Sequence, residues 1–517
     1  ATSPQAVVAL GMQAPSQGFG GVGTMQPSLL RRWFGPLRPG SLRAGLLVLT
    51  TTAMGAGVLT LPFALAELGW CTGVGVIVAL GLLNAASLEV LLEVGMRCGA
   101  TSYSELVCAV QGPAAARFLD LTVTIVTWGA ITAYFIFIKQ LLPAVLAAYG
   151  IPASVARAEV VLPCVGALVF VIALPRSITA IGKFSILGVC SVVYVAALLI
   201  HQAATRAGSA SHIPMASTEH RVSLGRMANA CAIIIASFLC QYNVFFVYAD
   251  VSDPTVRRLR KITRLSALFQ TTFYVTIAMC GYASFGESTN DNIYTNFPGS
   301  DRWVDTGRAL VCASLCIGIP LCTFAARANL VGLLSRLLSE EPTTCAAAVS
   351  SSAASVGLAY AASLDDEAAG DGVHVSGFCT HTPLCSRPHS RTHSAASCPT
   401  PSSSLAAPLC TGPDPDSTSQ DVASVPDDVQ SFGAAAWLLH VGSTASILLL
   451  TLALAFVMPS ISFLLGKLGG ICGVTQMYVL PGLALLRNPD LRPPVQCVQI
   501  LCGFAAATLV GLMAVVL

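Results

Sequence analysis

Residues 50–62 of this 517-residue chain read Thr-Thr-Thr-Ala-Met-Gly-Ala-Gly-Val-Leu-Thr-Leu-Pro, within an apolar run long enough to cross a bilayer. Gly55 and Gly57 lie about 15–20 Å from the start of that run, at about 1.5 Å per residue. Two glycines weaken a helix at this depth, and Pro62 removes a backbone donor. We therefore expect a helix that is broken in the middle of a membrane.

The composition of the whole chain indicates that lipid is its solvent. Hydrophobic residues make up 54% of the sequence and charged residues 10%, whereas soluble domains carry about 25% charged residues. The net charge of +2 gives no basis for a nucleic-acid partner. Most of the 19 cysteines lie in apolar runs, where a thiol behaves as a small hydrophobe, so no disulfide framework is expected.

Eleven apolar segments meet or approach the length of roughly 20 residues that a membrane-spanning helix needs. They are 45–69, 72–96, 118–146, 158–174, 179–201, 227–249, 264–285, 307–334, 434–457, 460–486 and 494–517. Ten or twelve helices are the alternatives, because two of the divisions rest on tight turns near Trp70 and Pro459. Basic residues favour cytoplasmic loops, which places the N-terminus inside and the C-terminus outside. We expect an all-α polytopic membrane protein that has the lipid bilayer as a partner.

Two polar stretches lie outside these segments. Residues 1–43 are expected to be a largely disordered cytoplasmic tail, which shows no signal-peptide pattern. Residues 337–432 form a Ser/Pro/Ala/Thr-rich insert between helices 1–8 (44–336) and helices 9–11 (433–517). Such a composition predicts disorder, and the cytoplasmic insert is where protein partners could bind. Its cluster of Cys379, His381, Cys385, His389, His393 and Cys398 fits no zinc spacing, so no metal site is expected.

The expected break in the first helix favours one class of membrane protein. Non-helical backbone at membrane depth is tolerated only where it is buried in protein or lines a cavity. Secondary transporters use such breaks to present free N–H and C=O groups to substrate and ions. A glycine face that packs against another helix is the alternative, and the triple threonine and Pro62 favour the functional break.

Polar residues in other segments supply further candidates. Gln241, Tyr242 and Asn243 lie in the sixth segment at a depth similar to the first break, although no glycine or proline there predicts a second break. Glu89 and Glu93 are expected to form a partnered interfacial pair rather than a proton relay.

Thr323, after Pro320, could bind a cation or donate to its own helix. The membrane part carries no metalloprotease, nucleophile-elbow or P-loop signature, so we expect no enzyme, no catalytic residues and no cofactor. The expected energy source is an ion gradient.

Five stretches, in order, resemble the amino acid/auxin permease family of transmembrane amino acid transporters. This family belongs to the APC superfamily and includes vacuolar and neutral amino acid transporters. The stretches are 52–70, which contains Gly-Ala-Gly-Val-Leu-Thr-Leu-Pro, 102–106 with 112–113, 238–245, 281–287 and 320–327. The resemblance covers residues 40–335 and, more loosely, 433–517.

The resemblance implies an eleven-helix, LeuT-like fold with a five-plus-five inverted repeat and a broken first helix. It implies alternating-access symport of amino acids, of the neutral class, with protons or sodium. The membrane would be the plasma membrane or a vacuolar or lysosome-like membrane. The implied substrate-binding residues are Thr52, Met54, Gly55, Ala56, Gly57, Ser237, Cys240 and Asn243.

Thr51 and Thr323 are the implied ion-coupling candidates. Many relatives have asparagine at the position of Thr51 and His-Gln at the positions of Gln241 and Tyr242. These departures fall near the substrate and ion positions, so both H⁺ and Na⁺ stay open as coupling ions. An amino-acid sensor that uses the same site for signalling, with the insert as its partner-binding segment, is the alternative function.

Overall fold

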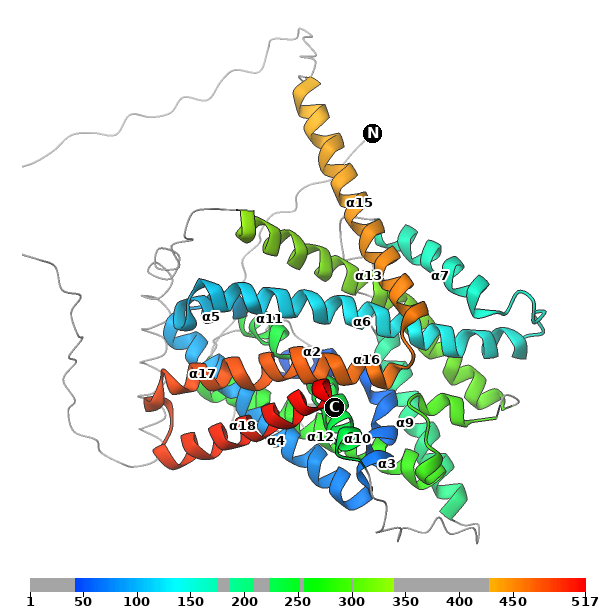
Figure 1. Ribbon diagram of the computed structural model, residues 1–517, viewed down its shortest axis with the longest axis horizontal. Helices are drawn as coiled ribbons and strands as arrows, with labels where there is room; N and C mark the ends of the chain where they lie inside the picture. Colours follow the sequence, from blue (N-terminus) through cyan, green and yellow to red (C-terminus); the bar gives the residue numbers. More distant parts are fainter. Residues whose placement is uncertain (1–41, 175–185, 208–222, 252–254, 299–300, 339–426) are drawn as a thin grey trace, which may run out of the picture.

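A computed structural model of the chain describes residues 42–174, 186–207, 223–251, 255–298, 301–338 and 427–517, and every regular element in these ranges is a helix (Figure 1). The expected all-α class is therefore confirmed for the described residues. Most of the N-terminal tail, residues 339–426 of the insert and the Cys/His cluster lie outside them. The parts of the expected insert that are described, 337–338 and 427–432, belong to the flanking helices.

The helices follow the expected segments closely. The first half of the chain contains α2 (Leu42–Ala53), η1 (Ala56–Thr60), α3 (Leu61–Leu68), α4 (Trp70–Cys98), α5 (Tyr103–Gln111), α6 (Pro113–Ala148), α7 (Ala158–Ala173), α9 (Ile186–Ala207), α10 (Leu224–Phe238), η3 (Gln241–Asn243) and α11 (Val244–Asp250). The second half contains α12 (Val256–Phe285), η4 (Gly286–Ser288), η5 (Ile293–Asn296), α13 (Arg302–Leu338), α15 (Asp427–Val457), α16 (Ile461–Leu468), η6 (Gly469–Gly473), η7 (Thr475–Val479), α17 (Leu480–Leu486), η8 (Pro489–Leu491) and α18 (Pro494–Val516).

Each of the eleven predicted segments corresponds to helical structure. Eight helices in the described ranges are long and apolar enough to cross a membrane. Of the other three segments, the first is interrupted, α7 has 16 residues, and α12 carries buried polar side chains such as Gln270. The chain is thus a multi-pass membrane protein, and the total of eleven spans stays a prediction.

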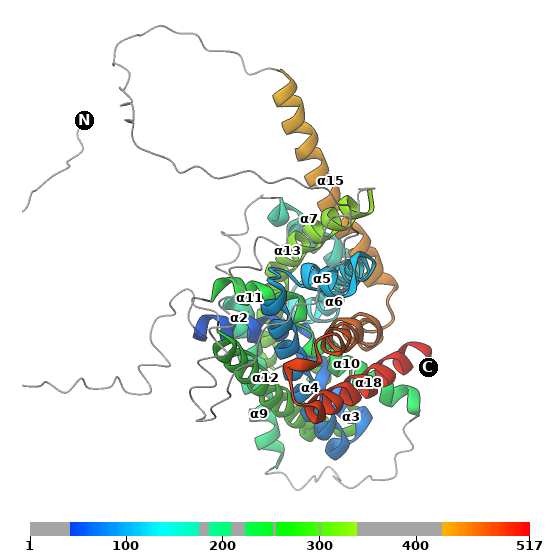
Figure 2. The ribbon, with the colours of Figure 1, turned by 90° about the vertical axis from the view of Figure 1, so that its left-hand side faces the viewer.

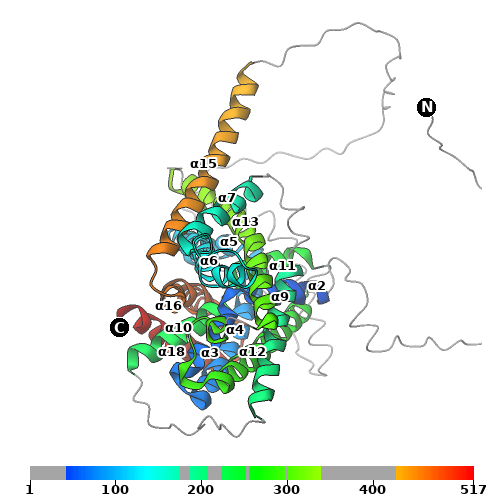
Figure 3. The same ribbon diagram turned by 90° about the vertical axis from the view of Figure 1, so that its right-hand side faces the viewer.

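The interrupted helices lie in the middle of the bundle. Helix α10 packs against α3, α16 and α18, while α12 packs along α4 and α2 (Figures 1 and 2). Helices α6 and α13 run side by side, and α15 begins away from the bundle and then contacts them and α7 (Figure 3). The first and sixth segments are both interrupted, which is the pattern of the five-plus-five inverted repeat in the LeuT-like fold.

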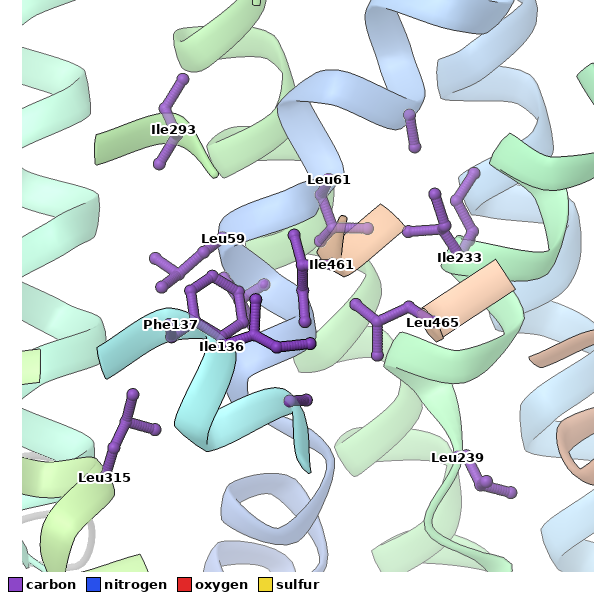
Figure 4. Close-up of a cluster of buried hydrophobic side chains, with 14 of the residues drawn as sticks. Leu59, Leu61, Ile136, Phe137, Ile233, Leu239, Ile293, Leu315, Ile461 and Leu465 are labelled. Atoms are coloured by element: carbon purple, nitrogen blue, oxygen red, sulfur yellow. The ribbon is translucent and has the colours of Figure 1, made fainter. Parts of the chain in front are cut away.

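A buried apolar cluster fixes the second half of the first segment. Leu59 and Leu61 point toward side chains from several other helices (Figure 4). These partners are Ile136 and Phe137 of α6, Ile233 of α10, and Ile461 and Leu465 of α16. Both leucines are almost fully buried, so η1 and α3 are held by packing and not only by their own hydrogen bonds.

Two buried carboxylates tie helices together at the inner end, which is the expected cytoplasmic end. Glu89 of α4 pairs with Arg264 (2.6 Å) and with Arg492 (2.8 Å). Glu93 pairs with Arg260 (2.7 Å) and with Arg492 (3.1 Å). The expectation of a partnered pair is therefore confirmed: Arg492 joins the turn before α18 to both carboxylates of α4, and each carboxylate also pairs with α12.

Substitution of Arg492 by alanine should lower the stability of the folded protein. Glu93 is 2% exposed, and each carboxylate keeps one arginine partner, so the loss should be about 1.5–3 kcal/mol, as for hydrogen bonds to charged groups. The melting temperature of the purified protein measures the loss. Arg257→Ala, at an exposed position on α12, is the matched control and should leave the melting temperature unchanged. Equal melting temperatures for the two variants would contradict the conclusion that Arg492 stabilises the fold through Glu89 and Glu93.

Candidate functional site

The first helix breaks where its glycines lie. Helix α2 ends at Ala53, Met54 and Gly55 are non-helical, and the 3₁₀ helix η1 starts at Ala56. Gly55 has an extended backbone, and its carbonyl accepts the N–H of Val58 at 3.3 Å. Pro62 lies in the first turn of α3, where a missing N–H is tolerated. The first N–H groups of η1 and the last carbonyls of α2 therefore lack partners within their own helices.

The sixth helix is also broken, although its sequence contains no glycine or proline that predicts it. Helix α10 ends at Phe238, Leu239 is extended, and helical structure resumes at Gln241. In a continuous α-helix the carbonyl of Ser237 would accept the N–H of Gln241. Here that carbonyl accepts the hydroxyl of Tyr274 from α12 at 2.7 Å.

A second hydrogen bond to a side chain replaces a helix bond at the N–H of Cys240, within the same break. The N–H of Cys240 donates to the side-chain oxygen of Gln241 at 3.0 Å. Its partner in a continuous helix would be the carbonyl of Ala236, which instead accepts the N–H of Leu239 at 3.4 Å. Side chains therefore replace the helix bonds on both sides of the break, which is a known way in which polar groups compete with helices.

The two breaks meet at Gly57 and Ser237. A Cβ atom on Gly57 would lie 2.7 Å from the hydroxyl oxygen of Ser237 and 3.3 Å from its Cα. The hydroxyl of Ser237 is buried and donates to the carbonyl of Ile233 at 2.9 Å. Gly57 is thus a close-packing glycine between η1 and α10, and the packing interpretation applies to this one of the two glycines.

Gly55 has a different environment. Of the described atoms, only the hydroxyl oxygen of Tyr134 lies within 4 Å of the position that a Cβ on Gly55 would take, at 3.7 Å. Tyr134 comes from α6, and its hydroxyl faces the thiol of Cys322 on α13. Tyr242 of the sixth helix faces the same thiol. Met54, Gly55, Tyr134, Tyr242 and Cys322 are all partly accessible.

The loop between α12 and α13 lies against the first break, because η5 contacts η1. Asp291 accepts the N–H groups of Ile461 (3.0 Å) and Ser462 (3.2 Å) at the start of α16. Asn292 donates to Gln140 of α6 at 2.9 Å. Ile293 of η5 is buried near Leu59 (Figure 4). This loop therefore joins α16 and α6 beside the first break.

The other predicted site residues lie as follows. Cys240 is buried, and Asn243 is partly accessible in η3. Thr323 is buried, and its hydroxyl donates to the carbonyl of Ile319 at 2.8 Å, which is the helix-bonded alternative. The side chains of Thr51, Thr52 and Ala56 lie outside the described part of the structure.

A family model described as transmembrane amino acid transporter protein matches residues 38–489 of this chain. The chain belongs to this family. The expected resemblance is confirmed, and the two breaks lie within the matched range.

Several amino acid transporters of other organisms are similar to the chain at low sequence identity. The sodium-coupled neutral amino acid transporter 7 of Xenopus laevis is 25% identical over 64% of the chain and 72% of its own length. The vacuolar amino acid transporter 2 of Saccharomyces cerevisiae is 23% identical over 55% of the chain and 59% of its own length. The chain spans 42% of the length of a Toxoplasma gondii relative named as an amino acid transporter, at 23% identity over 59% of the chain.

A solved structure also resembles this family member. The manganese transporter of Eremococcus coleocola, in its H236A mutant, gives a TM-score of 0.45 at 10% identity. The alignment covers 92% of this chain and 86% of the other. A likeness at that level says nothing about what this family member carries.

Three residues near the breaks were not candidates in the sequence: Tyr134, Asn84 and Tyr274. Each is a polar side chain inside an apolar helix, and such a side chain must face protein, water or ligand. That rule alone flags all three, but their partners come from distant helices and cannot be assigned from the sequence.

The two glycines should respond differently to alanine. Gly57→Ala should lower the melting temperature, because an extra methyl group against Ser237 overpacks the contact at about 1–2 kcal/mol. Gly55→Ala is the matched control and should be tolerated, since the new methyl group meets only the Tyr134 hydroxyl at contact distance. Thermal unfolding of the two purified variants gives the comparison. A larger drop in melting temperature for Gly55→Ala than for Gly57→Ala would mean that Gly55, and not Gly57, is the close-packing glycine.

Proposed function

We propose that this chain is a secondary active transporter that moves amino acids across a membrane by alternating access. The observation that supports the proposal is the pair of helix breaks, which bring backbone groups outside regular helix bonding together where Gly57 lies against Ser237. Amide groups at the start of η1 suit the carboxylate of an amino acid. Carbonyl groups at the end of α2 suit its ammonium group, as do those of the sixth helix that do not already accept the Tyr274 hydroxyl or the Leu239 N–H.

The side chains near Gly55 favour substrates of the neutral class. Tyr134, Tyr242, Cys322 and Gly318 come together there, and a Cβ on Gly318 would lie 3.2 Å from the Tyr134 ring. None of these four groups carries a charge at neutral pH. A charged substrate side chain would gain no opposite charge from them and would lose its hydration. The name of one relative, a sodium-coupled neutral amino acid transporter, supports the same class.

The energy source in this proposal is a gradient of protons or sodium. Thr51 and Thr323 stay the candidate ion-coupling residues. The N-terminus faces the cytoplasm, and the membrane is the plasma membrane or a vacuolar or lysosome-like membrane. An amino-acid sensor remains the alternative, and it differs because binding would occur without net uptake.

Purified protein in proteoliposomes should accumulate at least one neutral amino acid when a proton or sodium gradient is imposed. Uptake of a panel of labelled amino acids under each gradient measures this, with a protonophore or sodium removal to identify the ion. Liposomes without protein are the control. No accumulation under either gradient would refute the transporter, and amino-acid binding without accumulation would favour the sensor.

Gly55→Leu should abolish that uptake while the protein still folds. A leucine side chain would extend toward Tyr134 and occupy the space beside the first break. Gly75→Leu on α4 is the matched control, because a Cβ there has no described atom within 4 Å and the position is exposed. Normal uptake by Gly55→Leu, at normal protein yield, would mean that substrate does not bind at this break.

A further inference from the structure

Three buried amide side chains connect the two broken helices. They are Gln241 in the sixth helix, Asn84 in α4 and Gln270 in α12, and each is 0% exposed. Buried amides are costly in an apolar environment unless their donors and acceptors are paired. Their hydrogen bonds therefore decide what they do in the fold.

The amides form one chain of hydrogen bonds. The Nε2 of Gln241 donates to the Oδ1 of Asn84 at 2.8 Å. The Nδ2 of Asn84 donates to the Oε1 of Gln270 at 3.4 Å. The Nε2 of Gln270 then donates to the backbone carbonyl of Leu49 in α2 at 3.4 Å and to the Oγ of Ser266 at 2.9 Å.

The two ends of this chain fix its direction. At one end the backbone N–H of Cys240, which can only donate, bonds to the Oε1 of Gln241. At the other end the carbonyl of Leu49 can only accept. Reversal of any one amide would place two donors or two acceptors face to face. The orientation of all three amides is thus determined by backbone groups of the two broken helices.

Two further bonds hold the ends of the amide chain. The hydroxyls of Thr50 and Ser266 lie 3.0 Å apart, which joins α12 to the last turn of α2. Gln241 also reaches the hydroxyl of Ser87 at 3.5 Å. The thiol of Cys240 is the titratable group that faces Asn84.

We propose that Gln241, Asn84 and Gln270 are positioning residues that hold the break of the sixth helix in register with the last turn of α2. Buried amides between membrane helices often act only as general packing contacts. The chain of amide hydrogen bonds described here differs because it starts and ends on the backbone of the two interrupted helices. Its role in transport rests on the proposed function, but the register itself can be measured without transport.

Asn84→Leu should loosen both breaks at once. We expect faster backbone hydrogen exchange in peptides 45–57 and 236–245, by about tenfold, because a buried bond of this kind is worth about one factor of ten. Exchange is measured by mass spectrometry on the purified full-length protein. Thr263→Val on α12 is the matched control, since its buried hydroxyl donates to carbonyls of its own helix, and neither peptide should change.

Asn84→Asp tests the same chain of amide hydrogen bonds, because in this one variant pH alone changes the donor and acceptor at position 84. A protonated aspartic acid can accept from Gln241 and donate to Gln270, whereas the carboxylate can only accept. Exchange in both peptides, relative to the wild type at each pH, should therefore be near normal at acid pH and rise at alkaline pH. If uptake is observed, the ratio of variant to wild-type uptake should fall over the same range, and Asn84→Leu should show no such recovery.

Three results would overturn the proposal. One is faster exchange confined to peptide 236–245, with 45–57 unchanged. Another is an equal rise in hydrogen exchange for Asn84→Leu and Thr263→Val, which would indicate general destabilisation. The third is an Asn84→Asp protein whose exchange does not depend on pH relative to the wild type. Failure of uptake in the wild type would refute the proposed function alone, because exchange is read independently.

Discussion

The constraint on which the rest of this structure depends is that backbone N–H and C=O groups in hydrocarbon must find partners inside the protein. A broken helix leaves several of these groups without partners in their own helix, and this fold contains two such helices side by side. Tyr274 supplies a partner for a carbonyl of α10, and Gln270 adds a bond from α12 to the carbonyl of Leu49 in α2. The breaks are stable because α4 and α12 bring polar side chains to them.

The two breaks have different physical origins. The first is encoded locally, by glycines of low helix propensity and a proline at the start of the following helix. The second is imposed by the hydroxyl of Tyr274 and the amide of Gln241, which take the places of helix bonds. The local signal made the first break predictable from the sequence. The second depends on a residue 37 positions away, and no local pattern around residue 240 indicates it.

The same distinction separates what could be predicted from what could not. Apolar runs predict the helices well, since their length alone follows from the thickness of a bilayer. The spacing of Glu89 and Glu93 predicts that they share one helix face, but not that Arg492 joins both. At the candidate site, Gly55 and Gly57 look equivalent in the sequence. Only the closeness of Ser237 to one and of Tyr134 to the other distinguishes their roles.

The hydroxyl of Tyr274 has a consequence for how the sixth helix can change shape. A helix interrupted by proline has lost a donor permanently, whereas α10 keeps both the carbonyl of Ser237 and the N–H of Gln241. Extension of α10 through the break would require the phenol to leave that carbonyl and the Cys240 N–H to leave the side chain of Gln241. The length of this helix thus depends on two hydrogen bonds to side chains, both of which can exchange for helix bonds without a change of sequence.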